Sequence, residues 1–131
     1  MKNLLAPLVL LGLALAGCGD DTTTRPIVPP AAPRGLFSVT GDGGVTLVWL
    51  ANTESDVTGY RVYQAPCASG SGCPYERIGT VSVPAGEEYV QYAVTGLANG
   101  ETAFFAVSAV DRDGLESDLS WNDVFDTPRP A

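Results

Sequence analysis

The chain has 131 residues, of which 45% are hydrophobic, and this size and composition suit one globular domain. Its formal net charge of −8 repels nucleic acid and anionic lipid headgroups, so neither is an expected partner. The sequence contains no His, and its only Lys is Lys2, which lies before the domain. The lack of these side chains argues against Ser-His and Cys-His catalysis, Schiff-base chemistry, His-ligated zinc and a phosphate-binding loop.

An apolar segment stands at the start of the chain. Leu4 to Ala16 is apolar apart from Gly12 and follows the positive side chain of Lys2. At ~1.5 Å per residue this segment makes a helix of about 20 Å, which is too short to span a bilayer core and is typical of a secretory signal. A buried core helix is the alternative, but it does not explain the position behind a lysine at the N-terminus.

Leu15-Ala16-Gly17-Cys18 ends this segment and resembles the lipobox of bacterial lipoproteins. Small side chains at Ala16 and Gly17 let an extended backbone enter a peptidase groove, and the thiol of Cys18 can form a thioether with diacylglycerol. The resemblance implies that residues 1–17 are a signal peptide, cleaved before Cys18, and that the new amine is acylated. An ordinary secretory signal with an incidental Cys is the alternative.

Lipid on Cys18 would hold the mature chain on a membrane of the cell envelope, outside the cytoplasm. Three long acyl chains make release negligible, since each buried methylene contributes ~0.8 kcal/mol. The residue after Cys18 is Gly19 rather than the Asp that favours inner-membrane retention in enteric bacteria, so the outer membrane is preferred. The mature chain keeps six Arg against 15 acidic residues, a formal charge of −9, so lipid rather than charge provides the anchor.

Residues 18–33 are predicted to be a tether. They combine a polar Asp and Thr stretch with four prolines between Pro26 and Pro33, a composition that favours an extended chain over a packed one. The Pro-x-x-Pro spacing would also fit a ligand of proline-binding domains, but a spacer is the preferred interpretation for an exported protein.

From Arg34 onward, apolar residues alternate with a period close to two, and turn clusters separate the alternating segments. Within one segment, for example, Val45, Leu47 and Trp49 share a face. The expected strands are 36–40, 45–49, 60–64, 75–83, 89–95, 103–110 and 122–127. Seven short strands without a helical stretch predict an all-β, antiparallel sandwich.

The motifs in these strands resemble those of fibronectin type III domains. They are Val45-Thr46-Leu47-Val48-Trp49, Gly59-Tyr60-Arg61-Val62-Tyr63, Tyr92-Ala93-Val94-Thr95-Gly96-Leu97, Asn99-Gly100, Phe105-Ala106-Val107-Ser108-Ala109-Val110-Asp111 and Gly114-Leu115-Glu116-Ser117. The resemblance implies a seven-stranded, immunoglobulin-like sandwich over residues 34–128, followed by a tail over 129–131. It also implies that Trp49 and the late-strand residues Phe105, Val107 and Ala109 are buried. A true immunoglobulin domain fits less well, because the sequence lacks its third-strand Trp and its Cys pair between the sheets.

One position departs from the family. A Tyr commonly follows the residue matched by Leu97 at a distance of six, and its hydroxyl bonds back to the backbone. Ala103 stands there, so Phe104 or a shifted register is expected to compensate for the lost bond.

Cys67 and Cys73 bracket a Ser/Gly-rich loop. In an oxidising compartment such a loop lets two thiols pair, so a structural disulfide is predicted. Free thiols are the alternative; a redox role lacks the Cys-x-x-Cys spacing, and a metal site lacks further soft ligands.

Asp111 and Asp113 precede Gly114 in a segment that resembles the start of a calcium loop. The remaining ligands of such a loop are missing, so we interpret the segment as an acidic turn rather than a metal site. Trp121 follows at the same end of the sandwich. It either packs at a sheet edge or, if exposed, forms a candidate binding surface with Asp111 and Asp113.

These observations predict a membrane-anchored, extracytoplasmic lipoprotein whose domain is a non-catalytic interaction or structural module without a cofactor. An envelope or extracellular protein is the expected partner. Binding of cell-wall or extracellular glycan through Trp121 is the alternative. Hydrolysis by paired carboxylates would need a deep cleft, which a small filled sandwich does not offer.

Overall fold

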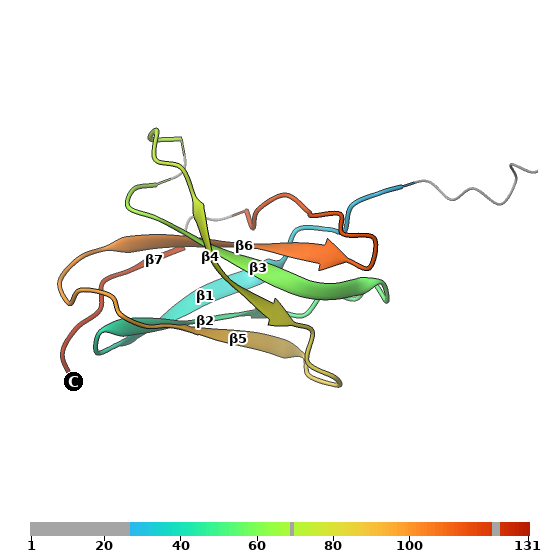
Figure 1. Cartoon of the computed structure of the whole chain (residues 1–131). Helices are drawn as coiled ribbons and strands as arrows, with labels where there is room; N and C mark the ends of the chain where they lie inside the picture. The colour runs from blue at the N-terminus through green and yellow to red at the C-terminus, as the bar shows by residue number, and fades with distance from the viewer. Residues whose placement is uncertain (1–26, 69, 122–123) are drawn as a thin grey trace, which may run out of the picture.

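The computed structural model describes residues 27–68, 70–121 and 124–131, which form two antiparallel β-sheets packed face to face (Figure 1). The strands are β1 (Arg34–Gly41), β2 (Gly44–Leu50), β3 (Val57–Ala65), β4 (Glu76–Ser82), β5 (Tyr89–Val94), β6 (Ala103–Asp111) and β7 (Val124–Asp126). One sheet has the order β1-β2-β5 and the other β4-β3-β6-β7. The all-β sandwich of seven antiparallel strands that the sequence predicts is confirmed.

Several predictions concern residues outside the described part of the chain. They are the signal peptide over 1–17, the lipid attachment at Cys18 and the tether as far as residue 26. Across the residues that the structure does describe, there is no helix with the length and apolar character needed to cross a membrane.

The strands differ from their predicted bounds by one to three residues, and two of the differences have a clear cause. β3 begins at Val57 rather than at Tyr60, because Val57 pairs with Asp111 of β6 and is 8% exposed. β7 ends at Asp126 rather than Thr127, because the Asp126 carboxylate accepts the Thr127 backbone N–H at 2.8 Å and takes it out of the ladder.

The core lies between the two sheets and is centred on Trp49 of β2. Its ring is 0% exposed and meets the ring of Tyr60 from β3 edge to face, with centroids 5.4 Å apart. Alternation along β2 and β6 supplies the other large members, as the sequence predicts: Val45, Leu47, Phe105, Val107 and Ala109 are all buried. Such burial is the main favourable term in folding.

The packed domain begins before Arg34, so the predicted tether over 18–33 is too long. Pro30 and Pro33 are buried, and the backbone of Ala31 is bound at both polar groups. Its N–H donates to Glu54 Oε2 at 2.7 Å, and its carbonyl accepts from Asn52 Nδ2 at 2.8 Å. Proline composition predicted an exposed spacer, but long-range contacts with the β2–β3 connection give these residues fixed partners.

The predicted tail over 129–131 is likewise partly integrated into the domain. Pro128 is fully buried, and its carbonyl accepts the Gly100 N–H at 2.9 Å. The Arg129 N–H donates to the Gly41 carbonyl at 3.1 Å. The chain therefore stays in contact with the β1–β2 turn one residue beyond the predicted boundary.

The loop before β6 is fixed without the Tyr that the family commonly has at the position of Ala103. Asn99 takes over this bracing: its Oδ1 accepts the Gly43 N–H at 2.8 Å, and its Nδ2 donates to Asp42 Oδ1 at 2.9 Å. Phe104, the expected substitute, instead stacks on Phe125 of β7 with ring centroids 5.4 Å apart.

Each open side of the sandwich is closed by one polar side chain between the sheets. On the β1/β7 side, the Thr40 hydroxyl donates to Asp126 Oδ1 at 2.6 Å. On the β5/β4 side, the Tyr92 hydroxyl donates to the Ile78 carbonyl at 3.4 Å and lies directly over Gly79. A Cβ at Gly79 would lie 2.1 Å from that hydroxyl oxygen, so glycine is required for this approach.

Candidate functional site

A groove of about 580 Å³ runs along the side of the sandwich, between residues 30–36 and a short segment that includes Asp118, Ser120 and Trp121. The Trp121 side chain is 89% exposed, so its ring is available to a ligand rather than packed at the sheet edge. We refer to this feature as the Trp121 groove.

Two serines fix the segment that carries Trp121 to β6. Ser117 donates its N–H to the Ala109 carbonyl and accepts the Ala109 N–H on its Oγ, both at 2.8 Å. Ser120 repeats this pattern with Val107, at 2.9 and 3.1 Å. The side-chain oxygens take the place of backbone carbonyls, so β6 keeps its hydrogen bonds although the segment is not a regular strand.

Asp111 does not belong to the Trp121 groove, and its predicted place on a binding surface is wrong. It is 3% exposed, and its Oδ1 accepts the N–H groups of Asp113 and Leu115, each at 2.9 Å. This is an Asx-type turn in which the carboxylate serves the backbone. Asp113 is exposed but does not line the groove. No cluster of three potential metal ligands occurs among the described residues.

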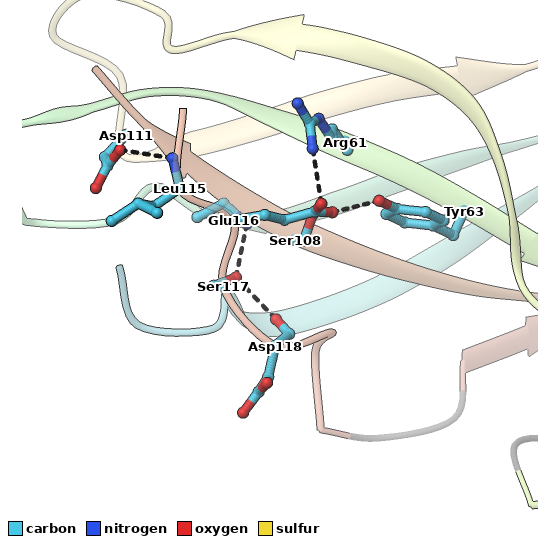
Figure 2. A network of polar contacts seen from close by, with 9 residues as sticks. Arg61, Tyr63, Ser108, Asp111, Leu115, Glu116, Ser117 and Asp118 are labelled. Atoms are coloured by element: carbon cyan, nitrogen blue, oxygen red, sulfur yellow. Dashed lines mark hydrogen bonds and ion pairs between the residues drawn. The ribbon is translucent and has the colours of Figure 1, made fainter. Parts of the chain in front are cut away.

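A polar network that the sequence did not predict lies on the outer face of the four-stranded sheet, centred on Glu116 (Figure 2). Arg61 and Tyr63 of β3 point toward its carboxylate. The Arg61 guanidinium contacts Oε1 at 2.7 Å, while the hydroxyls of Tyr63 and Ser108 both donate to Oε2. Ser108 is 0% exposed, so its hydroxyl has no contact with water in the folded chain. The network therefore attaches the connection after β6 to the sheet.

The sequence held only part of the signal for this network. Alternation with the buried Tyr60 and Val62 places Arg61 and Tyr63 on the outer face. Glu116 follows a turn, however, and no periodicity indicates which way its side chain points.

The network shifts the protonation of its members. Burial opposes ionisation of Glu116, but the hydrogen bonds from Ser108, Tyr63 and Arg61 outweigh it and hold the pKa below the ordinary value of 4.5. Burial and the bond to Glu116 raise the pKa of Tyr63. Between the sheets, burial likewise opposes ionisation of Asp126, yet the hydroxyls of Thr40 and Ser38 keep its pKa below 3.8.

These shifts predict an acid-sensitive fold. Because the folded-state pKa values of Glu116 and Asp126 are lowered, their stabilisation is present above the ordinary values of 4.5 and 3.8 and is lost as pH falls through the folded-state values. We expect the free energy of unfolding, measured with urea from about pH 7 down to about pH 2.5, to fall over the acid end of that range. Glu116→Gln should remove part of the acid-dependent loss, and an unchanged profile in that variant would contradict the assignment.

The outer face of the three-stranded sheet is unusually apolar. Register and alternation place nine side chains on it: Arg34, Phe37 and Val39 from β1, Thr46, Val48 and Leu50 from β2, and Tyr89, Gln91 and Ala93 from β5. Arg34, at the end of the sheet, is the one charged residue among the nine. Phe37, Val39 and Tyr89 are 47%, 51% and 47% exposed. We call this surface the three-stranded face.

Cys67 and Cys73 form a disulfide, with their Cα atoms 5.7 Å apart. It closes the connection between β3 and β4, and its neighbours Gly70 and Gly72 have φ values of +83° and +92° that only glycine adopts readily. The pairing that the sequence predicts is therefore present, and neither cysteine lines the Trp121 groove.

Comparison with known proteins supports the fold. No model of a protein family matches the chain. The curated amylopullulanase of Thermoanaerobacterium saccharolyticum is 33% identical over 107 residues, which cover 81% of this chain but 7% of the relative. The chain thus spans less than a tenth of that relative's length.

Many solved structures are similar over most of the described residues, and two of them illustrate the likeness. The Fn3-like protein from Clostridium thermocellum is 29% identical with a TM-score of 0.60, over 75% of this chain and 92% of that one. The β-1,2-glucanase from Parabacteroides distasonis is 21% identical with a TM-score of 0.56, over 79% of this chain and 13% of that one, a likeness of fold alone. With these similarities and two antiparallel sheets of three and four strands, the chain carries a fibronectin type III-like domain.

Proposed function

We propose that the chain is a lipid-anchored, extracytoplasmic protein whose domain is a non-catalytic interaction module for an envelope or extracellular protein. The observation that carries the interaction role is the three-stranded face. The solvated side of an antiparallel sheet is normally polar, and a contiguous apolar surface in its place marks an interaction site.

The anchor rests on the sequence around Cys18. Purification from native membranes and intact-mass analysis should find a chain that begins at Cys18 and carries a diacylglycerol thioether and an acylated amine. Cys18→Ser should abolish acylation, whereas Cys67→Ser should leave it intact because Cys67 belongs to the disulfide. An unmodified residue 18, or another N-terminus, would contradict the anchor, the cell-envelope location and the outer-membrane preference.

The non-catalytic assignment is supported by the absence of His from the sequence and the confinement of Lys to Lys2. In the Trp121 groove, Asp118 is the one carboxylate among the described lining residues, whereas glycoside hydrolysis commonly needs two. Hydrolytic activity that persists through purification to homogeneity and disappears in Asp118→Asn would overturn this assignment.

Glycan binding is a second candidate function, favoured by the exposure of Trp121. A solvent-exposed indole beside a groove can stack on the apolar face of a sugar ring, and a neutral glycan is not repelled by an acidic chain. The amylopullulanase relative gives this candidate further support.

The glycan candidate predicts a selective loss on substitution of Trp121. On a panel of soluble cell-wall and extracellular glycans, Trp121→Ala should weaken binding by about tenfold or more, while Trp121→Phe should retain part of it. Tyr89→Ala is the matched control, because it removes another exposed aromatic ring from a different surface. A panel without binding by the unaltered chain would end the glycan candidate.

A further inference from the structure

The three-stranded face is a contiguous surface and not a set of isolated exposed residues. Phe37 pairs with Val48, which pairs with Gln91, and Val39, Thr46 and Ala93 form the next row. Neighbouring strands lie about 4.8 Å apart, so the side chains within each row touch or nearly touch. Arg34, Leu50 and Tyr89 form a third row at the end of the sheet.

The face is too small to form a stable interface by itself. A specific interface buries about 800 Å² on each partner. The three-stranded face is three strands wide and three residue rows long, which gives it roughly a third of that area. A docked partner must therefore also contact residues around the face, and their charges decide which partners fit.

The residues next to Tyr89, beside the three-stranded face, are acidic. Glu87 and Glu88 are exposed and directly precede Tyr89, and exposed Asp42 lies in the β1–β2 turn at the opposite end. Exposed Arg34 lies in the same row as Tyr89 but on β1, at the far edge of the sheet from Glu87 and Glu88. Exposed Arg129 is bound through its backbone to Gly41 beside Asp42. This arrangement leaves the Glu87–Glu88 pair as the largest concentration of one charge beside the face.

We infer that the three-stranded face binds a protein whose docking surface has an apolar centre and Lys or Arg side chains opposite Glu87 and Glu88. A second copy of the chain fits poorly, because each mature copy carries a formal charge of −9 and their long-range fields repel. If a different protein has basic residues around its docking surface, the two charged surfaces attract each other, and association is faster at low salt. This inference rests on the proposed function and names the surface and partner chemistry for it.

The test places a photo-crosslinking amino acid at one of three exposed positions in the full chain, including its leader, in the native cells. Gln91 lies in the middle row of the three-stranded face, on β5; Thr80 lies on the opposite sheet, and Asp118 lies at the Trp121 groove. We expect one discrete adduct from Gln91 alone. Phe37→Asp should lower its yield about tenfold, and the paired reversal Glu87→Lys with Glu88→Lys should lower it several-fold.

Each of the other outcomes would contradict a specific part of the inference. An adduct from Asp118 but not Gln91 would reject the three-stranded face while leaving the interaction module standing, and a Gln91 adduct of twice the chain mass would identify a second copy. An adduct that the charge reversal leaves unchanged would reject the basic border. Absence of adducts at all three positions would reject both the inference and the proposed function. Phe37→Asp must keep its unfolding midpoint, and Val39→Thr serves as a milder variant if it does not.

Discussion

Replacement of Trp49 by Ala is expected to lower the free energy of unfolding by about 3 to 5 kcal/mol, the largest effect of any single truncation proposed for this domain. The indole is completely buried between the sheets and packs against Tyr60. Its loss leaves a cavity, because the hydrogen-bonded strands around it cannot move close enough together to fill the space. Small domains are stable by roughly 5 to 15 kcal/mol, so this substitution removes a large share of the total. Urea unfolding followed by circular dichroism measures the change.

Trp121→Ala is the matched control for this substitution. It removes the same side chain from a position that is 89% exposed, so we expect a change within about 0.5 kcal/mol. Equal losses at the two positions would mean that Trp121 is packed in solution, which would also remove the basis for ligand stacking at the Trp121 groove.

Removal of the Glu116 carboxylate is the second large effect, with an expected loss of roughly 2 to 3 kcal/mol in Glu116→Ala. Three donors lose their acceptor at once. The hydroxyl of Ser108 is completely buried, so water cannot fully replace the hydrogen bond that this hydroxyl loses. Differential scanning calorimetry should show a midpoint lower by roughly 10 to 20 °C.

Glu101→Ala is the matched control for Glu116→Ala, because Glu101 is an exposed glutamate outside the network. Its midpoint should barely change. If Ser108→Ala in the Glu116→Ala background restored no stability, the cost would have to come from lost packing and not from an unpaired buried hydroxyl.

The seven strands, the burial of Trp49 and the late-strand core were predictable because they depend on local alternation. A side chain's face in a strand follows from its position in a period of two, so Val45, Leu47 and Trp49 could be assigned together. The Cys67–Cys73 disulfide was predictable for a similar reason, since a short Ser/Gly loop brings its two ends together without help from the rest of the chain.

What the sequence determined by itself is therefore the set of strands and their inward faces, since both follow from contacts between near neighbours in the chain. The tertiary structure alone decided where the domain starts, which way Glu116 points, that Asn99 braces the loop before β6, and that Asp111 serves a turn. Each of these depends on a polar group whose partner lies in a different segment or across a turn. A hydrogen bond depends on direction and distance in space, and these exist only once the sheets have packed.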